Sequence, residues 1–236
     1  MFISSTRIPK FVGSVLFVCA GFLTYGDSLL FEKIYLALLG FVAVLFIRDI
    51  NLVSIIVISA GANLSSELLY PLVISEQFQF PLKILTYLVA CWTLLKVSED
   101  SMRLPTVFVV VLCLVTEGYW YISEQDAPMI FWYVLLLTIN LWVRHFLFAR
   151  VFIMAKYFPS QYRSLNLDHS LYQLVFFYIL LHQFILLEYI LRRVFDVSST
   201  YVYYAAPYIF HGLTTYSALL VLFQGYTLIS KNWFKA

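Results

Sequence analysis

The sequence is short of charge and of glycine. Of its 236 residues only 12% are charged and eight are glycine, while 62% are hydrophobic. A soluble domain has about a quarter charged residues, and a compact fold of this length cannot bury so much apolar surface. The net charge of +2 is also too small to indicate a nucleic-acid partner. The composition therefore indicates that the lipid bilayer is the solvent of this chain.

Recognisable catalytic and cofactor-binding motifs are lacking as well. The sequence contains no nucleophile elbow, HExxH zinc helix, phosphate-binding loop or dinucleotide-binding fingerprint. The three cysteines lie in apolar runs without a CxxC spacing, which is typical of small buried hydrophobic residues: Cys19, Cys91 and Cys113. We therefore expect a protein that is not an enzyme and that needs no cofactor and no metal ion.

What the chain has instead is a series of long apolar runs. A helix needs about 20 residues to cross a bilayer, and eight runs approach that length: 8–25, 29–47, 52–69, 82–97, 105–122, 127–146, 171–191 and 201–229. The fourth run is the weakest, because only 12 uncharged residues lie between Lys83 and Lys96. The first run follows Arg7 and Lys10 as in a signal peptide, but no convincing cleavage site follows it, so we expect a retained span.

These runs predict an all-α integral membrane protein. We expect a single transmembrane domain over residues 1–236, built as a polytopic bundle of about eight helices, with a seven-helix bundle as the alternative. The basic residues orient it. If the N-terminus is cytoplasmic, eleven of the 15 Lys and Arg residues fall on the inner side: Arg7, Lys10, Arg48, Lys96, Arg103, Arg144, Arg150, Lys156, Arg163, Lys231 and Lys235.

Basic residues near span ends favour the cytoplasmic side, so this majority predicts that both termini are cytoplasmic. The expected location is a bacterial inner membrane. Four basic residues fall on the outer side: Lys33, Lys83, Arg192 and Arg193. The adjacent arginines Arg192 and Arg193 are the clearest exception to the rule.

The acidic residues show the opposite bias. Nine of the 13 fall on the outer side: Asp27, Glu32, Glu67, Glu76, Glu117, Glu124, Asp126, Glu188 and Asp196. Acids contribute little to insertion, so the topology does not require this bias. Five of the nine lie in two hairpins that share the tetrapeptide Ile-Ser-Glu-Gln, at residues 74–77 and 122–125. The repeat is compatible with a duplicated hairpin or with chance, and its glutamates, Glu76 and Glu124, are candidate partner-binding residues.

The longest inner loop, residues 151–170, mixes aromatic with basic residues. This mixture suits the headgroup layer, so we expect an interfacial cytoplasmic segment within the transmembrane domain. Asp168 near its end is expected to cap the helix that follows. Arg144, shortly before the loop, is expected to extend toward the headgroups.

Polar residues inside the apolar runs are candidate functional residues, because ionisable groups are costly in a bilayer. Asn63 and Glu67 lie on one polar stripe of the third run. The stripe is compatible with hydrogen bonds between helices or with a wet path that opens to the outer face. Glu117, near the outer end of the fifth run, can join the Glu67 helix in an acidic vestibule.

His182 and His211 lie at comparable depth in the last two runs, which cross the membrane in opposite directions. Neutral imidazoles there can form a hydrogen-bonded contact between helices, relay protons, or ligate haem or a metal ion. The hydrogen-bonded contact explains the same residues without a cofactor, and the other two interpretations remain open.

Two hypotheses for the function follow. The first is binding of another membrane component, as an accessory subunit, an assembly factor or an immunity protein against a membrane-inserting toxin. Short loops, missing motifs and large aromatic faces favour it, with 22 Phe and 18 Tyr in the chain. The alternative is a proton- or cation-linked transporter or channel that uses Glu67, Glu117, His182 or His211. Scarce glycine disfavours it, because many transporters use broken, glycine-rich helices.

Overall fold

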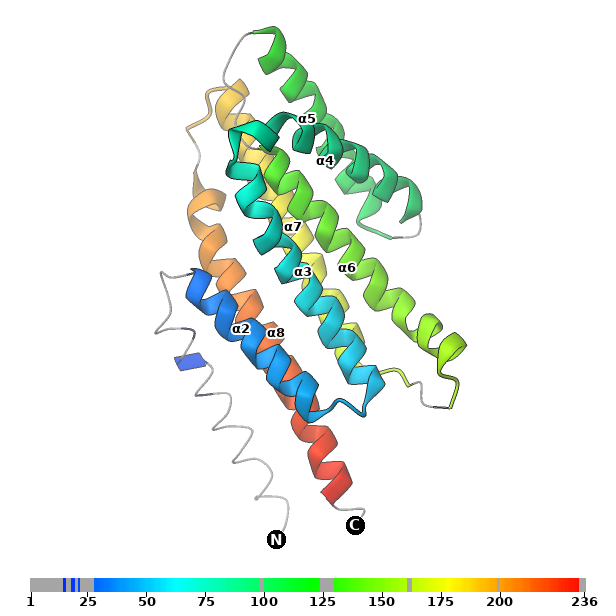
Figure 1. Cartoon of the computed structure of the whole chain (residues 1–236). Helices are drawn as coiled ribbons and strands as arrows, with labels where there is room; N and C mark the ends of the chain where they lie inside the picture. The colour runs from blue at the N-terminus through cyan, green and yellow to red at the C-terminus, as the bar shows by residue number, and fades with distance from the viewer. Residues whose placement is uncertain are drawn as a thin grey trace. The chain divides into compact units, whose positions relative to one another are not determined.

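The computed structural model describes residues 15, 18–19, 21, 28–97, 100–123, 130–160, 163–198 and 200–233. Over these residues the chain forms seven helices and no strand (Figure 1). A helix satisfies its backbone N–H and C=O groups within one segment, as the hydrocarbon layer of a membrane requires. The predicted all-α fold class is confirmed for this part of the chain.

Six of the seven described helices are long and apolar enough to cross a membrane. Helix α2 covers Ser28–Leu45, and the six are α3 (Ile50–Ile74), α4 (Glu76–Lys96), α5 (Arg103–Ile122), α6 (Ile130–Tyr157), α7 (Asn166–Val194) and α8 (Tyr201–Trp233). They make the chain a multi-pass, membrane-embedded protein. The first predicted run, residues 8–25, lies largely outside the described residues, so the count of eight spans stays a prediction.

Helices α3 and α4 are separated by a single residue. Ser75 has an extended backbone (φ −71°, ψ 116°), and its amide donates to the carbonyl of Pro71 (3.2 Å). Pro71 lies inside α3 and Pro81 inside α4. The loop expected between the third and fourth runs is therefore a helix junction, and Glu76 is the first residue of α4.

Helices α6 and α7 extend beyond the predicted runs. They contain 28 and 29 residues, which corresponds to about 42 Å at 1.5 Å per residue. The hydrocarbon core of a bilayer is about 30 Å thick, so their ends reach the headgroup layer unless they tilt. Of the predicted loop at residues 151–170, only residues 158–165 lie between the two helices. The interfacial position of this segment stays a prediction.

Aspartates stabilise the starts of two helices. Asp49 precedes α3, and its Oδ1 accepts from the amides of Asn51 (3.2 Å) and Leu52 (3.3 Å), as an N-cap residue does. Asp168 is the third residue of α7, and its Oδ2 accepts from the amide of Leu165 (2.9 Å). This bond is one half of a capping box. Asp168 thus caps the helix as expected, but from inside its first turn.

The chain divides into two compact units. Unit 1 comprises Met1–Asn63, Leu147–Leu174 and Ile209–Ala236, and unit 2 comprises Leu64–Phe146 and Val175–Tyr208. The boundaries fall inside helices α3, α6, α7 and α8. Large buried side chains occur in both units, with Leu39, Leu52 and Ile55 in unit 1 and Trp120, Phe131 and Ile179 in unit 2. The prediction of a single domain over residues 1–236 stays a prediction.

Candidate functional site

Unit 1 contains a buried ion pair between α6 and α7. Arg150 Nε donates to Asp168 Oδ1 (2.6 Å), and Arg150 Nη2 donates to Asp168 Oδ2. The Arg150 side chain is 2% exposed. Two parallel N–H···O bonds match the planar guanidinium to the carboxylate, which is the strongest form of such a pair.

Neighbouring segments satisfy the other donors of Arg150. Its Nη1 donates to the carbonyl of Asn51 (3.3 Å) and to Ser54 Oγ (3.4 Å), and its Nη2 donates to the carbonyl of Arg163 (3.3 Å). Asn51 Oδ1 accepts from the amide of Arg163 (3.0 Å), and the Arg163 guanidinium pairs with Asp49. We name this group the unit 1 ion cluster: Asp49, Asn51, Ser54, Arg150, Arg163 and Asp168.

Unit 2 contains a second buried arginine, Arg144 of α6. Its Nε donates to Asp100 Oδ2 (2.7 Å) and its Nη2 to Ser101 Oγ (3.3 Å). The side chains of Arg144 and Asp100 are only 4% and 6% exposed. The expected extension of Arg144 toward the headgroups is wrong, because Asp100, just before α5, neutralises the guanidinium inside the unit.

Glu117, a predicted site residue, is also neutralised within unit 2. Its Oε2 accepts from Lys83 Nζ (2.6 Å), and its Oε1 accepts from the hydroxyl of Tyr87 (3.5 Å). Both partners belong to α4, which packs against α5 (Figure 1). Glu117 therefore contributes no free negative charge to the predicted acidic vestibule.

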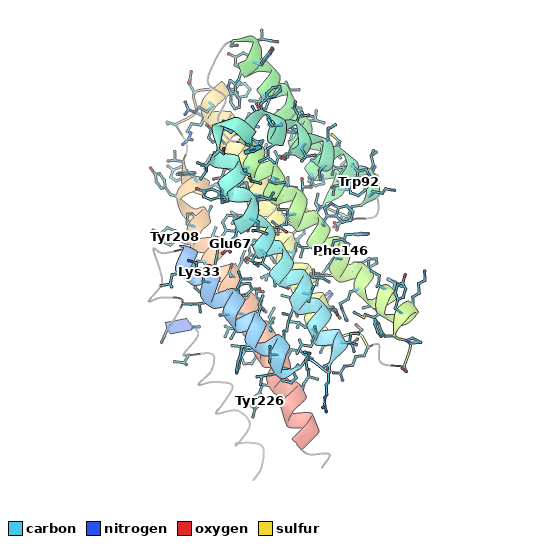
Figure 2. The ribbon with its side chains drawn as sticks, in the orientation of Figure 1. Lys33, Glu67, Trp92, Phe146, Tyr208 and Tyr226 are labelled. Atoms are coloured by element: carbon cyan, nitrogen blue, oxygen red, sulfur yellow. The ribbon has the colours of Figure 1, made fainter. Side chains whose placement is uncertain are left out.

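Glu67 keeps an unsatisfied group. Its Oε1 is buried and has no hydrogen-bond partner among the residues that the structure describes, and Thr86 Oγ1 on α4 shares this condition. Figure 2 labels Glu67 on α3. Asn63, one turn earlier, donates from Nδ2 to the carbonyl of Ser59 (2.9 Å). A buried carboxylate oxygen without a donor destabilises the fold unless it takes up a proton or a cation.

The two candidate histidines belong to different units. His182 in unit 2 has Nδ1 at 2.7 Å from the carbonyl oxygen of Tyr178, one turn earlier in α7. His211 in unit 1 has Nε2 at 2.7 Å from the carbonyl oxygen of Gly21, and its ring lies 3.9 Å from that of Phe31. A carbonyl only accepts, so each of these nitrogens carries its proton and donates. The predicted contact between the two histidines stays a prediction.

Other polar side chains inside the helices of unit 2 are satisfied locally. Four threonines donate to the carbonyl four residues earlier, at 2.7–2.8 Å: Thr93, Thr106, Thr116 and Thr138. Such back-bonding satisfies a hydroxyl in an apolar surrounding without any partner helix. Two of these hydroxyls also accept, from Trp142 Nε1 (2.9 Å, to Thr93) and Gln183 Nε2 (2.9 Å, to Thr106). Trp142 in turn stacks against Trp92 and Phe146, which Figure 2 labels.

Glu188 of α7 binds the start of α8. Its Oε1 accepts from the amide of Val202 (3.0 Å) and its Oε2 from the amide of Tyr203 (2.6 Å). Helix N-terminal amides lack partners within their own helix, and a carboxylate there also interacts favourably with the helix dipole. This outer acid therefore has a structural role.

The side chains of two further predicted site residues, Glu76 and Glu124, lie outside the described part of the structure. The structure describes Glu76 as helical without its side chain, and Glu124 lies outside the described residues altogether. Among the described residues, no group of three or more His, Cys, Asp or Glu side chains is placed to hold a metal ion.

Three aspartates were not expected as ion-pair partners: Asp49, Asp100 and Asp168. All three fall on the predicted inner side, against the outer bias of the other acids, and each pairs with an inner arginine. An acid on the basic side of the topology is the signal in the sequence that points to such a pair.

The fold and these sites define a multi-pass helical membrane protein with four ion pairs among its described residues. No family model, curated protein or solved structure matches this chain. The geometry alone must therefore support any function.

Proposed function

We propose that the protein acts in a bacterial inner membrane by binding another membrane component. The partner is a transmembrane helix of another protein, as for an accessory subunit, an assembly factor or an immunity protein against a membrane-inserting toxin. The proposal assigns the chain eight spans, two cytoplasmic termini and no catalytic step. The observation that carries it is the composition of the exposed face of α8.

The ion pairs are compatible with the proposed order of spans, although they do not depend on which side is cytoplasmic. Lys83 and Glu117 both fall on the predicted outer side, and the other three pairs fall on the predicted inner side: Arg144–Asp100, Arg150–Asp168 and Arg163–Asp49. Every ion pair of the described residues thus joins two residues of the same predicted side. The proposed topology requires this, because opposite ends of membrane-spanning helices are about 30 Å apart.

Helix α8 is covered far less than α6 or α7. Only 22% of its most apolar stretch is buried, compared with 56% in each of the other two helices. Exposed apolar surface on a membrane helix contacts either lipid or another protein. The residues on the exposed face of α8 distinguish contact with lipid from contact with another protein.

Within unit 1, the exposed face of α8 carries four residues: Ile209, Gly212, Tyr216 and Phe223. Their spacing of three, four and seven residues is that of helices that pack side by side. A Cβ atom at Gly212 would meet nothing within 4 Å, so another helix can approach closely there. The Tyr216 ring is 52% exposed, and it lies about 22 Å along the helix from Tyr201. At that depth lipid tails have no group that can form a hydrogen bond with the tyrosine hydroxyl, whereas a neighbouring helix has such groups.

The exposed face of α4 provides the contrast. Between residues 84 and 95 its exposed side chains are mostly aliphatic (Ile84, Leu85, Leu88 and Leu95), together with Cys91 and Trp92. A mostly aliphatic face without glycine is typical of contact with lipid tails. The combination of glycine and tyrosine on α8 therefore favours a protein partner.

The proposal can be tested in cells with a photoreactive amino acid at position 216 of the full chain. We expect it to crosslink one membrane protein, and the same protein should purify with the chain in a fixed ratio in mild detergent. The matched control carries the photoreactive residue in place of Leu88, which is 63% exposed on the aliphatic face of α4. Gly212→Leu should abolish the co-purification, because its side chain blocks the approach of the partner helix. Equal crosslinking at both positions, or a lone monodisperse protein, would contradict the proposal.

A second candidate function is the movement of protons or cations, and the buried Glu67 Oε1 favours it. An unsatisfied acidic oxygen within a membrane helix is a candidate point on a path for protons or cations. Purified protein in liposomes should then pass a proton or cation flux that Glu67→Gln reduces. No flux across a broad panel of ions would rule this function out.

A further inference from the structure

Helix α7 ends in two adjacent arginines, Arg192 and Arg193. The end of the helix is well defined. The amide of Val197 donates to the carbonyl of Leu191 (3.3 Å), and Asp196 between them has a left-handed backbone (φ 51°). A left-handed residue just past the last turn is a common helix C-terminus, and the bond folds the chain back over the turn that carries the two arginines.

Neither arginine is neutralised by the described chain. The ion pairs of the described residues do not include Arg192, Arg193 or Asp196. The nearest acid on the same helix is Glu188, and both of its carboxylate oxygens accept from the amides that open α8. The three described arginines that form ion pairs, in contrast, each pair with an aspartate.

Tyrosine rings hold these guanidinium groups instead. The central carbon of Arg192 lies 5.1 Å from the ring centre of Tyr189 and 5.8 Å from that of Tyr203. The central carbon of Arg193 lies 6.0 Å from the ring centre of Tyr189. A cation–π contact uses the flat face of a guanidinium and leaves the N–H groups at its edge able to donate. The rings therefore position the arginines without satisfying their donors.

The location matches the headgroup layer of a membrane. The apolar run 171–191 of α7 is long enough to cross the roughly 30 Å of hydrocarbon, and the two arginines are the first residues after it. Exposed tyrosines follow it in sequence at the start of α8, with Tyr201 84% and Tyr204 67% exposed. Such rings are enriched at headgroup level. The two arginines also contradict the preference for basic residues inside, so orientation does not account for them.

We propose that Arg192 and Arg193, positioned by Tyr189 and Tyr203, bind the phosphate of an anionic phospholipid. Arginine forms two parallel hydrogen bonds to a phosphate, and two adjacent guanidinium groups offset the charge of one anionic headgroup. In the proposed topology this lipid lies in the outer leaflet. The inference is independent of the partner helix proposed for α8.

The test uses the full chain in detergent micelles, with phosphatidylglycerol, phosphatidylcholine or inorganic phosphate added. We expect phosphatidylglycerol to raise the Tm by about 3 °C, as a ligand near ten times its Kd does for a domain of this size, and phosphatidylcholine to have little effect. R192Q/R193Q should lose most of the shift. The matched control is K96Q/K156Q, which removes two exposed cations from the opposite predicted side and should retain the shift.

Native mass spectrometry of the unmodified protein gives a readout that does not depend on folding of the variant. It should show phosphatidylglycerol retained in preference to phosphatidylcholine. No such preference, or an equal Tm shift in R192Q/R193Q, would overturn the proposal. If inorganic phosphate alone reproduced the shift, the lipid assignment would be wrong.

Discussion

Arg150 in unit 1 and Arg192 in unit 2 are both arginines near the ends of long apolar helices, but their surroundings are opposite. Arg150 is 2% exposed, and its donors reach a carboxylate, a hydroxyl and two backbone carbonyls. Arg192 is only partly buried and lies against tyrosine rings, without a carboxylate among the described residues. The first guanidinium is closed to ligands and the second is open.

The difference shows where this chain uses charge for folding and where charge is left for binding. A buried charge is tolerated only when its partners replace water completely, so Arg150 and its acceptors form one structural unit. A charge at the membrane surface needs no such replacement and stays able to bind an anion. Variants that change one kind of site and not the other can test this distinction.

The largest expected effect is at Arg150. Arg150→Leu leaves Asp168 buried without its counter-ion and should lower the free energy of unfolding by about 3–5 kcal/mol. Thermal and chemical unfolding in detergent micelles measures this loss. The double variant R150L/D168L should recover part of it, because neither charge is then buried alone. A loss of less than about 1 kcal/mol in the single variant would show that the ion cluster is not the structural unit inferred here.

An intermediate effect is expected at Glu188. Glu188→Gln keeps one oxygen that can accept from an α8 amide but removes the negative charge, so it should cost about 1 kcal/mol. Hydrogen exchange of the Val202 and Tyr203 amides should become faster, while exchange in the core of α7 stays unchanged. If the exchange of both amides stayed as slow as in the unmodified protein, the carboxylate would not be what holds the start of α8.

Much of the helical framework could be predicted from the sequence, since apolar runs and helix caps are local signals. Pro105 lies in the first turn of α5 as its fixed φ favours, and Asp49 caps α3. The sequence predicted that α6 ends near Arg144, which is too early. A charged residue there suggested the end of a span, because one sequence does not show that Asp100 neutralises this arginine. The junction at Ser75 was expected to be a loop. A proline usually ends a helix, but α3 continues past Pro71 to Ile74.

The site was less predictable, because its contacts are distant in sequence. The bond between Arg150 and Asn51 joins residues 99 positions apart, and hydropathy carries no information about such a pair. Asn63 and His182 were chosen because they are polar within apolar runs. Each bonds to a carbonyl of its own helix one turn earlier, which any single polar residue of a membrane helix can do.

The smallest expected effect is at Arg163, the exposed member of the unit 1 ion cluster. Its side chain is 47% exposed, and its partner Asp49 keeps the two α3 amides as donors when the guanidinium is removed. Arg163→Gln should therefore cost less than about 1 kcal/mol, and the cost should shrink further in high salt, which screens exposed pairs. Asn51→Ala is the matched control. It removes a buried acceptor from the Arg163 amide and should cost about 1–3 kcal/mol without salt dependence. If Arg163→Gln destabilised the protein as much as Arg150→Leu, burial would not separate the structural charges of this chain from its accessible ones. The open state of Arg192 and Arg193 would then need an explanation other than exposure.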